Sequence, residues 1–183
     1  MVKRQTAKDI LAESFKELAE KKDIDKITIK EITDNCGYSQ ATFYRQFKDK
    51  YDLIAWDYAR GIEEIMDRID DNGYTWRQSL SDAADYYERG KNYLANLMLH
   101  TSGHDAFILY MNEINFNALE KHILKVSGEE VLVEATRMYI RLYCFGTVSL
   151  TCEWVLGRYE AAAVELAEVF EKSLPEPLKP YLS

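Results

Sequence analysis

The sequence has few residues that break helices or form covalent links. Of its 183 residues, three are prolines and eight are glycines, and the prolines all lie within residues 174–183. Cysteine is equally scarce: Cys36, Cys144 and Cys152 form an odd set without metal-ligand spacing. We therefore expect reduced thiols that pack as small hydrophobic side chains, and no disulfide framework.

Long apolar segments and catalytic motifs are also missing. Residues 1–9 contain no apolar run that could serve as a signal peptide, and no stretch is long and uncharged enough to span a membrane. The sequence thus predicts a cytoplasmic protein. It has no glycine-rich phosphate loop, Gly-x-Ser-x-Gly elbow or helical His-Glu-x-x-His. Neither an enzyme nor a cofactor is indicated.

A metal site is conceivable at His100 and His104, whose spacing would place two ligands on one helical turn. Ser102 and Gly103 lie between them and favour a break in the helix. We therefore expect a surface loop and no metal.

Charge is unevenly distributed along the chain. Residues 1–50 carry 11 basic and 9 acidic side chains, net +2, whereas residues 51–183 carry 12 and 22, net −10. An acidic body repels nucleic acid. Any binding to DNA is therefore expected at the N-terminal end, and it should weaken with salt.

Residues 28–53 predict two short helices separated by a tight turn, followed by the start of a third helix. Thr28 and Glu31 have the spacing of a capping box. Gly37 suits the left-handed end of that helix, and Ser39 suits the cap of the next one. Such a glycine turn holds two helices steeply crossed, which is typical of a helix-turn-helix DNA reader.

The second of these helices has two distinct faces. Phe43 and Phe47 lie four residues apart and should pack inward. The side chains left to face outward are Gln40, Ala41, Thr42, Tyr44 and Arg45. An ordinary helical hairpin is the alternative interpretation of this segment.

The pattern Ile27-Thr28-Ile29, Ile32, Gly37-Tyr38-Ser39, Thr42-Phe43-Tyr44, Phe47, Lys50 and Leu53 resembles the N-terminal domain of tetracycline-repressor-like (TetR family) regulators. The resemblance covers about the first fifty residues. It implies phosphate contacts from Thr28, Tyr44 and Lys50, and contacts to base edges or flanking phosphates from Gln40, Ala41, Thr42 and Arg45. Lys50 also follows Asp49, a predicted helix cap, where free backbone N–H groups favour an anion.

The rest of the chain is predicted to be helical, giving an all-α fold of three parts: a DNA-binding domain (1–48), a helical effector-binding and dimerisation domain (49–173) and an extended C-terminal tail (174–183). Leu11, Phe15 and Leu18 predict a first helix over about 6–21. A connecting helix is expected over about 50–69, ending at Asp70-Asp71-Asn72-Gly73. Further helices are expected over 75–88, 91–99, 104–126, 129–157 and 160–173.

Residues 142–152 contain no charge, and a helix that is apolar around most of its circumference must bury more than one face. We expect it to cover the core and to contact a second subunit, through Tyr143, Gly146, Leu150 and Trp154. The same segment resembles the dimerising C-terminal domain of a TetR subset that includes regulators of dihydroxyacetone-kinase operons. A core helix of a monomer is the alternative.

Aromatic side chains of the body suggest an effector pocket. The residues that we expect to line it are Tyr58, Ile62, Tyr86, Tyr93, Phe107, Tyr110 and Tyr143, although such a stripe is also typical of a packed core. The sequence thus predicts a homodimeric regulator, a repressor by default, which binds an inverted-repeat operator and is controlled by a small ligand. One rival is a co-regulator controlled by a protein partner, which a closed core would favour. A helical enzyme containing a helix-turn-helix is the other.

Overall fold

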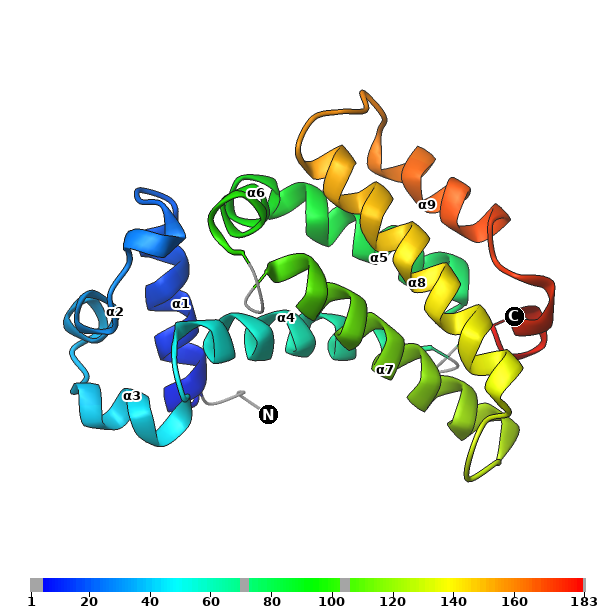
Figure 1. Cartoon of the computed structure of the whole chain (residues 1–183), viewed down its shortest axis with the longest axis horizontal. Helices are drawn as coiled ribbons and strands as arrows, with labels where there is room; N and C mark the ends of the chain where they lie inside the picture. Colours follow the sequence, from blue (N-terminus) through cyan, green and yellow to red (C-terminus); the bar gives the residue numbers. More distant parts are fainter. Residues whose placement is uncertain (1–4, 70–72, 103–105, 183) are drawn as a thin grey trace.

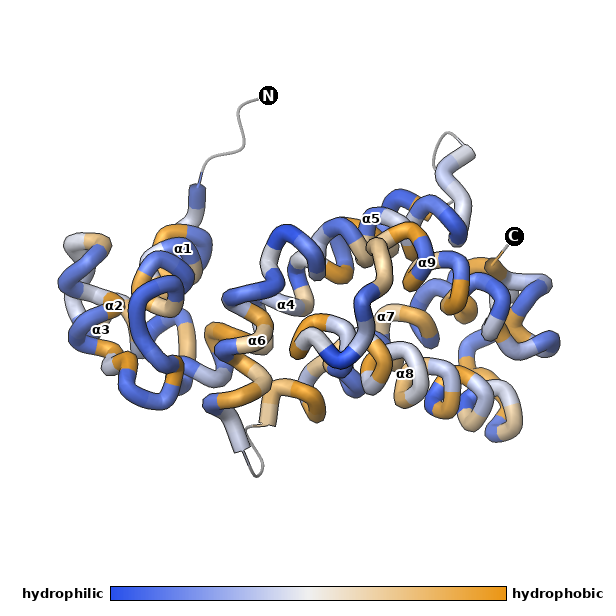
Figure 2. Tube along the Cα trace, turned by 90° about the horizontal axis from the view of Figure 1, so that it is seen from above, coloured by the Kyte–Doolittle hydropathy of each residue, from blue (hydrophilic) through white to orange (hydrophobic). Residues whose placement is uncertain are grey.

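The computed structural model describes residues 5–69, 73–102 and 106–182, and within these ranges the regular structure is entirely helical. Figures 1 and 2 show an elongated molecule with the N-terminal helices at one end and a bundle of the remaining helices at the other. The predicted all-α class is confirmed. None of the described helices is long and apolar enough to cross a membrane. His104 and Asp70-Asp71-Asn72 lie outside the described residues.

The N-terminal end, here called the head, consists of α1 (Ala7–Ala19), a short 3₁₀ turn η1 (Ile24–Lys26), α2 (Ile29–Cys36) and α3 (Gln40–Gln46). The inner faces of its helices form a small core in which Leu11, Phe15, Ile32, Phe43 and Phe47 are buried. The inward placement of Phe43 and Phe47 is therefore confirmed.

The predicted caps of the head are present. Thr28 Oγ1 accepts the Glu31 amide at 3.2 Å, and a Glu31 carboxylate oxygen accepts the Thr28 amide at 2.9 Å. These bonds and an ion pair with Lys22 lower the pKa of Glu31 to about 2, the Lys22 contact being the largest cause. Gly37 has φ 72°, and Ser39 accepts the Thr42 amide. Local hydrogen bonds thus determine where α2 and α3 begin and end.

A single helix, α4 (Lys50–Met66), leaves the head and enters the bundle, here called the body (Figure 1). In the body α5 packs against α9, and α7 packs against both α4 and α8. The body helices are α5 (Trp76–Arg89), α6 (Lys91–His100), α7 (Phe107–Ser127), α8 (Glu134–Val155) and α9 (Ala163–Lys172). Several are shorter than predicted: α8 begins at Glu134, not at 129, and α4 ends at Met66, not at 69.

The prediction of an extended C-terminal tail is wrong. Residues Glu176–Tyr181 form a 3₁₀ segment, η3, that packs against α7 and α8. The prolines suit this turn because their fixed φ is compatible with it. Leu174, Leu178 and Leu182 recur every four residues and are all buried. Burial of these leucines holds the segment on the body.

Candidate nucleic-acid interface, subunit contact and cavity

The outer face of α3 presents a row of polar side chains. Gln40, Ala41, Tyr44 and Arg45 are exposed and Thr42 is partly exposed, as the sequence predicted for the outward face. An Arg45 guanidinium nitrogen donates to Thr42 Oγ1 at 3.0 Å. The side chains of Gln40, Tyr44 and Arg45 offer hydrogen-bond donors on a helix of the width that a major groove admits.

Thr28 is exposed at the start of α2, on the same head. Its hydroxyl donates to Glu31 at 2.8 Å while also capping the helix. The structure therefore places Thr28 at a helix N-terminus, where backbone N–H groups favour a phosphate.

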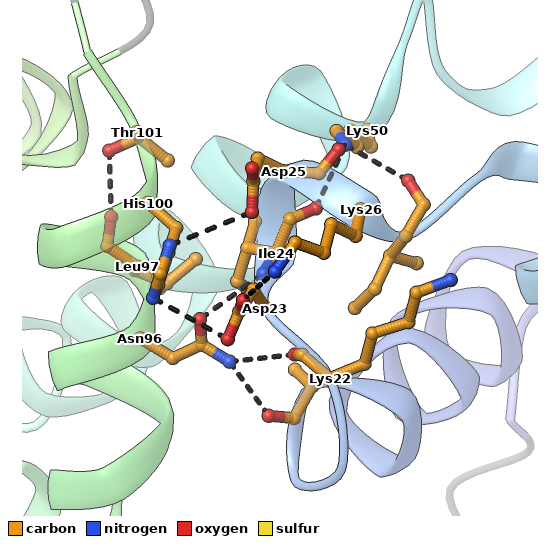
Figure 3. A network of polar contacts seen from close by, with 12 residues as sticks. Lys22, Asp23, Ile24, Asp25, Lys26, Lys50, Asn96, Leu97, His100 and Thr101 are labelled. Carbon is orange, nitrogen blue, oxygen red and sulfur yellow. Dashed lines mark hydrogen bonds and ion pairs between the residues drawn. The ribbon is translucent and has the colours of Figure 1, made fainter.

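Lys50 does not occupy the position that the resemblance implied. Its ammonium group donates to the backbone carbonyls of Ile24, Asp25 and Ile27 at 2.8, 2.9 and 2.9 Å (Figure 3). Burial lowers the pKa of this amine. An ammonium has three donors, and all three are used here. The predicted phosphate contact from Lys50 is contradicted, because the side chain connects the start of α4 to η1.

The same turn is contacted by the body. The Asn96 side chain, on α6, accepts the Ile24 amide at 3.1 Å and donates to the carbonyls of Ala19 and Lys22 at 2.8 and 2.9 Å (Figure 3). Lys50 and Asn96 therefore hold η1 from two sides. This junction is where the head, the connecting helix and α6 meet.

A second contact at this junction joins a histidine to two carboxylates. His100, the last residue of α6, has Nε2 3.6 Å from Asp23 and Nδ1 3.6 Å from Asp25 (Figure 3). The three side chains are close enough to suggest a metal cluster. Each ring nitrogen faces a different carboxylate, so His100 connects α6 of the body to two acidic side chains of the head.

The head is also fixed to the first half of α4. The Asp57 carboxylate is buried and lies 2.9 Å from Lys16 Nζ on α1 and 3.0 Å from the Arg60 guanidinium. Arg60 also pairs with Asp9, the N3 residue of α1. A buried carboxylate requires such partners. The head should consequently follow any movement of this half of α4.

The exposed face of α8 carries apolar side chains, but not all of those predicted. Gly146 is exposed and Leu150 is half-buried. The predicted roles of Tyr143 and Trp154 in a subunit contact are wrong. The Tyr143 hydroxyl donates to the Phe170 carbonyl at 2.9 Å, and Trp154 Nε1 donates to the Ala161 carbonyl at 2.7 Å, so both belong to their own subunit's core.

The apolar residues that α8 does expose are Met138 at 65%, Leu142 at 68% and Phe145 at 50%, one helical turn apart. On α9, Val164 and Val169 are exposed too. Exposed apolar side chains that lie together on a surface in this way typically mark a contact site for another protein. Periodicity alone could not identify them, because α8 is apolar on both faces.

A cavity of about 70 Å³ lies in the body between α4, α5, α7, α8 and α9. Of the seven residues predicted to line an effector pocket, only Ile62 and Tyr143 lie on its wall. Trp76 and Tyr87, on α5, and Asn115, on α7, also contribute and were not predicted. The core of the body thus contains an unfilled space, but a small one.

The other predicted pocket residues lie elsewhere. Tyr86 and Tyr93 border an open cleft between α1 and the α5–α6 corner. Phe107 is buried edge-on against Tyr58, with ring centroids 5.3 Å apart, and Tyr110 is half-buried near the start of α7. The prediction was wrong for these residues because helical spacing does not show which neighbour an aromatic ring meets.

Tyr58 lies directly behind the cavity wall. Its hydroxyl is 2.7 Å from the Tyr87 hydroxyl and accepts the Asn115 amide at 2.7 Å. Burial raises the pKa of Tyr87 to about 12, so both hydroxyls stay neutral. These bonds connect two wall residues to the middle of α4.

Residues 10–55 match the model of the family described as bacterial regulatory proteins, tetR family. The match begins in α1, contains all of α2 and α3 and ends in α4. The N-terminal domain belongs to the TetR family. A search of curated proteins gave no match.

The whole chain has the fold of solved TetR-family structures. A dihydroxyacetone kinase operon activator, DhaS, is 18% identical with a TM-score of 0.66, covering 97% of this chain and 98% of its own. A TetR regulator from Rhodococcus sp. RHA1 is 17% identical, with a TM-score of 0.64 and coverage of 92% and 98%. Thermus thermophilus FadR, a repressor in complex with lauroyl-CoA, is 16% identical, with a TM-score of 0.61 and coverage of 91% and 92%.

Identity at this level shows the shared fold only. The chain thus combines a TetR-family DNA-binding domain with a body that has the fold of TetR-family regulators.

Proposed function

We propose that this TetR-family protein is a homodimeric repressor which binds an inverted-repeat operator and releases it when a small ligand occupies the body. The observation that supports this proposal most is the exposed polar face of α3, on a head fixed to α4 through Asp57 and to α6 through Asn96. Two such heads on a two-fold dimer would match two half-sites about one DNA turn, roughly 34 Å, apart.

Dimerisation is supported by the apolar face of α8 and α9. Met138, Leu142 and Phe145 form a row on one side of α8. A Cβ atom built at the adjacent Gly146 would meet no atom of another helix within 4 Å. A glycine at this place allows two copies of the helix to approach closely. Sedimentation equilibrium at micromolar concentration tests the dimer directly.

Control by a small ligand is supported by the cavity, because Ile62 and Met66 of α4 form part of its wall. A ligand there would contact the helix that carries the head. T. thermophilus FadR was solved with lauroyl-CoA, but a cavity of about 70 Å³ is far below the usual size of a site for a large ligand. We therefore favour a small compound. The alternative, control by a docked protein partner, would be supported if operator release required only that partner.

Footprinting of the bound DNA tests the operator proposal. We expect two protected half-sites related by a two-fold axis, with gene expression rising when the protein is deleted. Protection of a single half-site would contradict the inverted-repeat operator. A fall in gene expression on deletion would contradict the repressor role.

Two substitutions on α3 should have different consequences for DNA binding. Arg45→Ala removes a candidate base contact and should change which sequences are preferred, by about 1–3 kcal/mol at the affected base pair. Tyr44→Phe removes only a hydroxyl that we assign to phosphate, and should weaken all operators about equally. Binding to a randomised operator library measures both. Equal effects of the two variants on sequence preference would contradict these assignments.

A further inference from the structure

A cleft lies between the head and the body, where α1 faces the α5–α6 corner. Its central part has a volume of about 350 Å³ and is bordered by Glu20 at the end of α1, by Tyr86 and Arg89 of α5, and by Tyr93 of α6. It continues toward η1 as a wider space of about 660 Å³. Sites for small ligands usually measure about 300–1,000 Å³. The cleft shares no wall residue with the 70 Å³ cavity, so it is a separate place on the molecule.

Two tyrosine rings form the inner side of the cleft. The Tyr93 ring lies edge-on against Phe15 of α1, with ring centroids 6.3 Å apart. The Tyr86 ring lies against α4 at Gly61, where a Cβ atom would come within 3.3 Å of the ring. Glycine inside a helix costs about 1 kcal/mol relative to alanine, and the packing of Tyr86 explains its presence here. The flat faces and edges of these rings suit an aromatic ligand.

The hydroxyl groups of the same two tyrosines are available to a ligand. Burial raises the pKa of Tyr86 and of Tyr93, so both hydroxyls stay protonated. Neither has a hydrogen-bond partner among the residues that the structure describes. Deeper in the body, by contrast, the hydroxyls of Tyr58 and Tyr87 lie 2.7 Å apart and bond to each other. Two neutral donors thus border the cleft.

The two walls of the cleft carry opposite charges that do not pair. Glu20 lies on the head and Arg89 on the body, both are exposed, and neither forms an ion pair within the described ranges. Arg89 donates only from Nε, to the Asp85 carbonyl at 3.2 Å, which leaves its terminal nitrogens for a carboxylate. Lys16, the remaining charged residue of this central part, is already paired with Asp57.

We propose that this cleft binds a small zwitterion with an aromatic ring between its two charges, whose carboxylate pairs with Arg89 and whose ammonium group pairs with Glu20. The ring lies on Tyr86 and Tyr93. A cavity of about 150 Å³ holds one benzene molecule, so the central part admits a compound of about twelve non-hydrogen atoms. A compound with one charge alone leaves either Glu20 or Arg89 without a counter-charge.

Such a ligand contacts the head and the body at once. Its ammonium group is held by α1 and its carboxylate by α5, while Tyr86 also touches α4 at Gly61. Occupancy therefore holds the head at one position relative to the body. A ligand changes DNA binding only through different affinity for the competent and incompetent positions. We expect the zwitterion to change operator affinity, and this consequence alone rests on the proposed function.

The test compares three aromatic compounds of the same size. 4-(Aminomethyl)benzoate carries both charges, 4-ethylbenzoate carries only the carboxylate, and 4-nitrobenzylamine carries only the ammonium group. Each is titrated into the full-length, DNA-free protein at low salt, and heat release is measured by calorimetry. We expect the zwitterion to bind about fivefold more tightly than either singly charged compound, because both ion pairs are exposed and each contributes modestly.

Two substitutions assign the charges. In Arg89→Gln the zwitterion should bind no better than 4-nitrobenzylamine, and in Glu20→Gln it should bind no better than 4-ethylbenzoate. Both side chains are exposed, so both variants should fold. Glu88→Gln is the matched control, because Glu88 is exposed beside Arg89 on α5 but does not border the cleft. It should leave all three affinities unchanged.

The proposal is overturned if the zwitterion binds wild type no better than the singly charged compounds, or if either cleft substitution leaves its preference intact. Operator affinity is measured separately, with and without the zwitterion. A protein that binds its operator but not the zwitterion would contradict this site and leave the proposed function standing. Binding through Glu20 and Arg89 without a change in operator affinity would support the site and contradict its effect on the head.

Discussion

Replacing Gly146 by leucine is expected to convert the protein from dimer to monomer and to lower its operator affinity sharply. The side chain would stand on the exposed face of α8, beside Phe145 and one turn from Leu142. Overpacking of a close contact costs about 1–3 kcal/mol, and a two-fold axis repeats the contact. The dimer dissociation constant should rise at least about thirtyfold.

The effect should be confined to the subunit contact. A Cβ atom at Gly146 meets no atom within 4 Å in its own subunit. Leucine also favours a helix by up to about 1 kcal/mol over glycine. The monomer should therefore be at least as stable as before, and sedimentation and thermal unfolding together measure both quantities.

Gly146→Ala is the matched control, because alanine also favours a helix over glycine but adds only one methyl group to the subunit contact. We expect it to remain dimeric and to bind the operator normally. A wild-type protein that sediments as a monomer at micromolar concentration would contradict the basis of this prediction, as would a dimeric Gly146→Leu variant.

Replacing Lys50 by methionine is expected to destabilise the head without changing the salt dependence of DNA binding. The methionine keeps the apolar stem but leaves the carbonyls of Ile24, Asp25 and Ile27 without their donor. Hydrogen bonds to a charged group contribute about 1.5–3 kcal/mol, and Lys50 is partly exposed. A loss of about 2–3 kcal/mol is therefore expected for this junction.

Hydrogen exchange of the η1 and α2 amides measures the loss of stability at the junction. A salt titration of operator binding measures whether the charge of Lys50 contributes to DNA binding. A phosphate contact predicts the opposite pattern, namely unchanged protection and a salt slope lower by about one. Lys48→Met is the control. Lys48 is exposed two residues away and its side chain makes no ion pair with the described residues, so its loss should leave protection unchanged.

The sequence by itself determined the boundaries of the head. The pair Thr28 and Glu31, the turn at Gly37 and the cap at Ser39 act between residues three to five positions apart, so the local sequence is sufficient to predict them. The outward face of α3 followed in the same way, because Phe43 and Phe47 fix which side of a short helix is inside.

The tertiary structure decided what the body helices contact. Along α8 both faces are apolar, and only the packing of α5 and α9 shows that Tyr143 and Trp154 face inward while Leu142 and Phe145 face outward. A periodic pattern predicts which side chains share a face of a helix. It does not predict which neighbouring helix or subunit covers that face.

The role of Lys50 was likewise decided by the fold, because the carbonyls that it binds lie 23 to 26 residues earlier in the chain. The cavity of the body likewise combines side chains from five helices, α4, α5, α7, α8 and α9. Local propensities specify where helices begin and end, whereas the environment of a single polar atom is set by residues that the sequence keeps far apart.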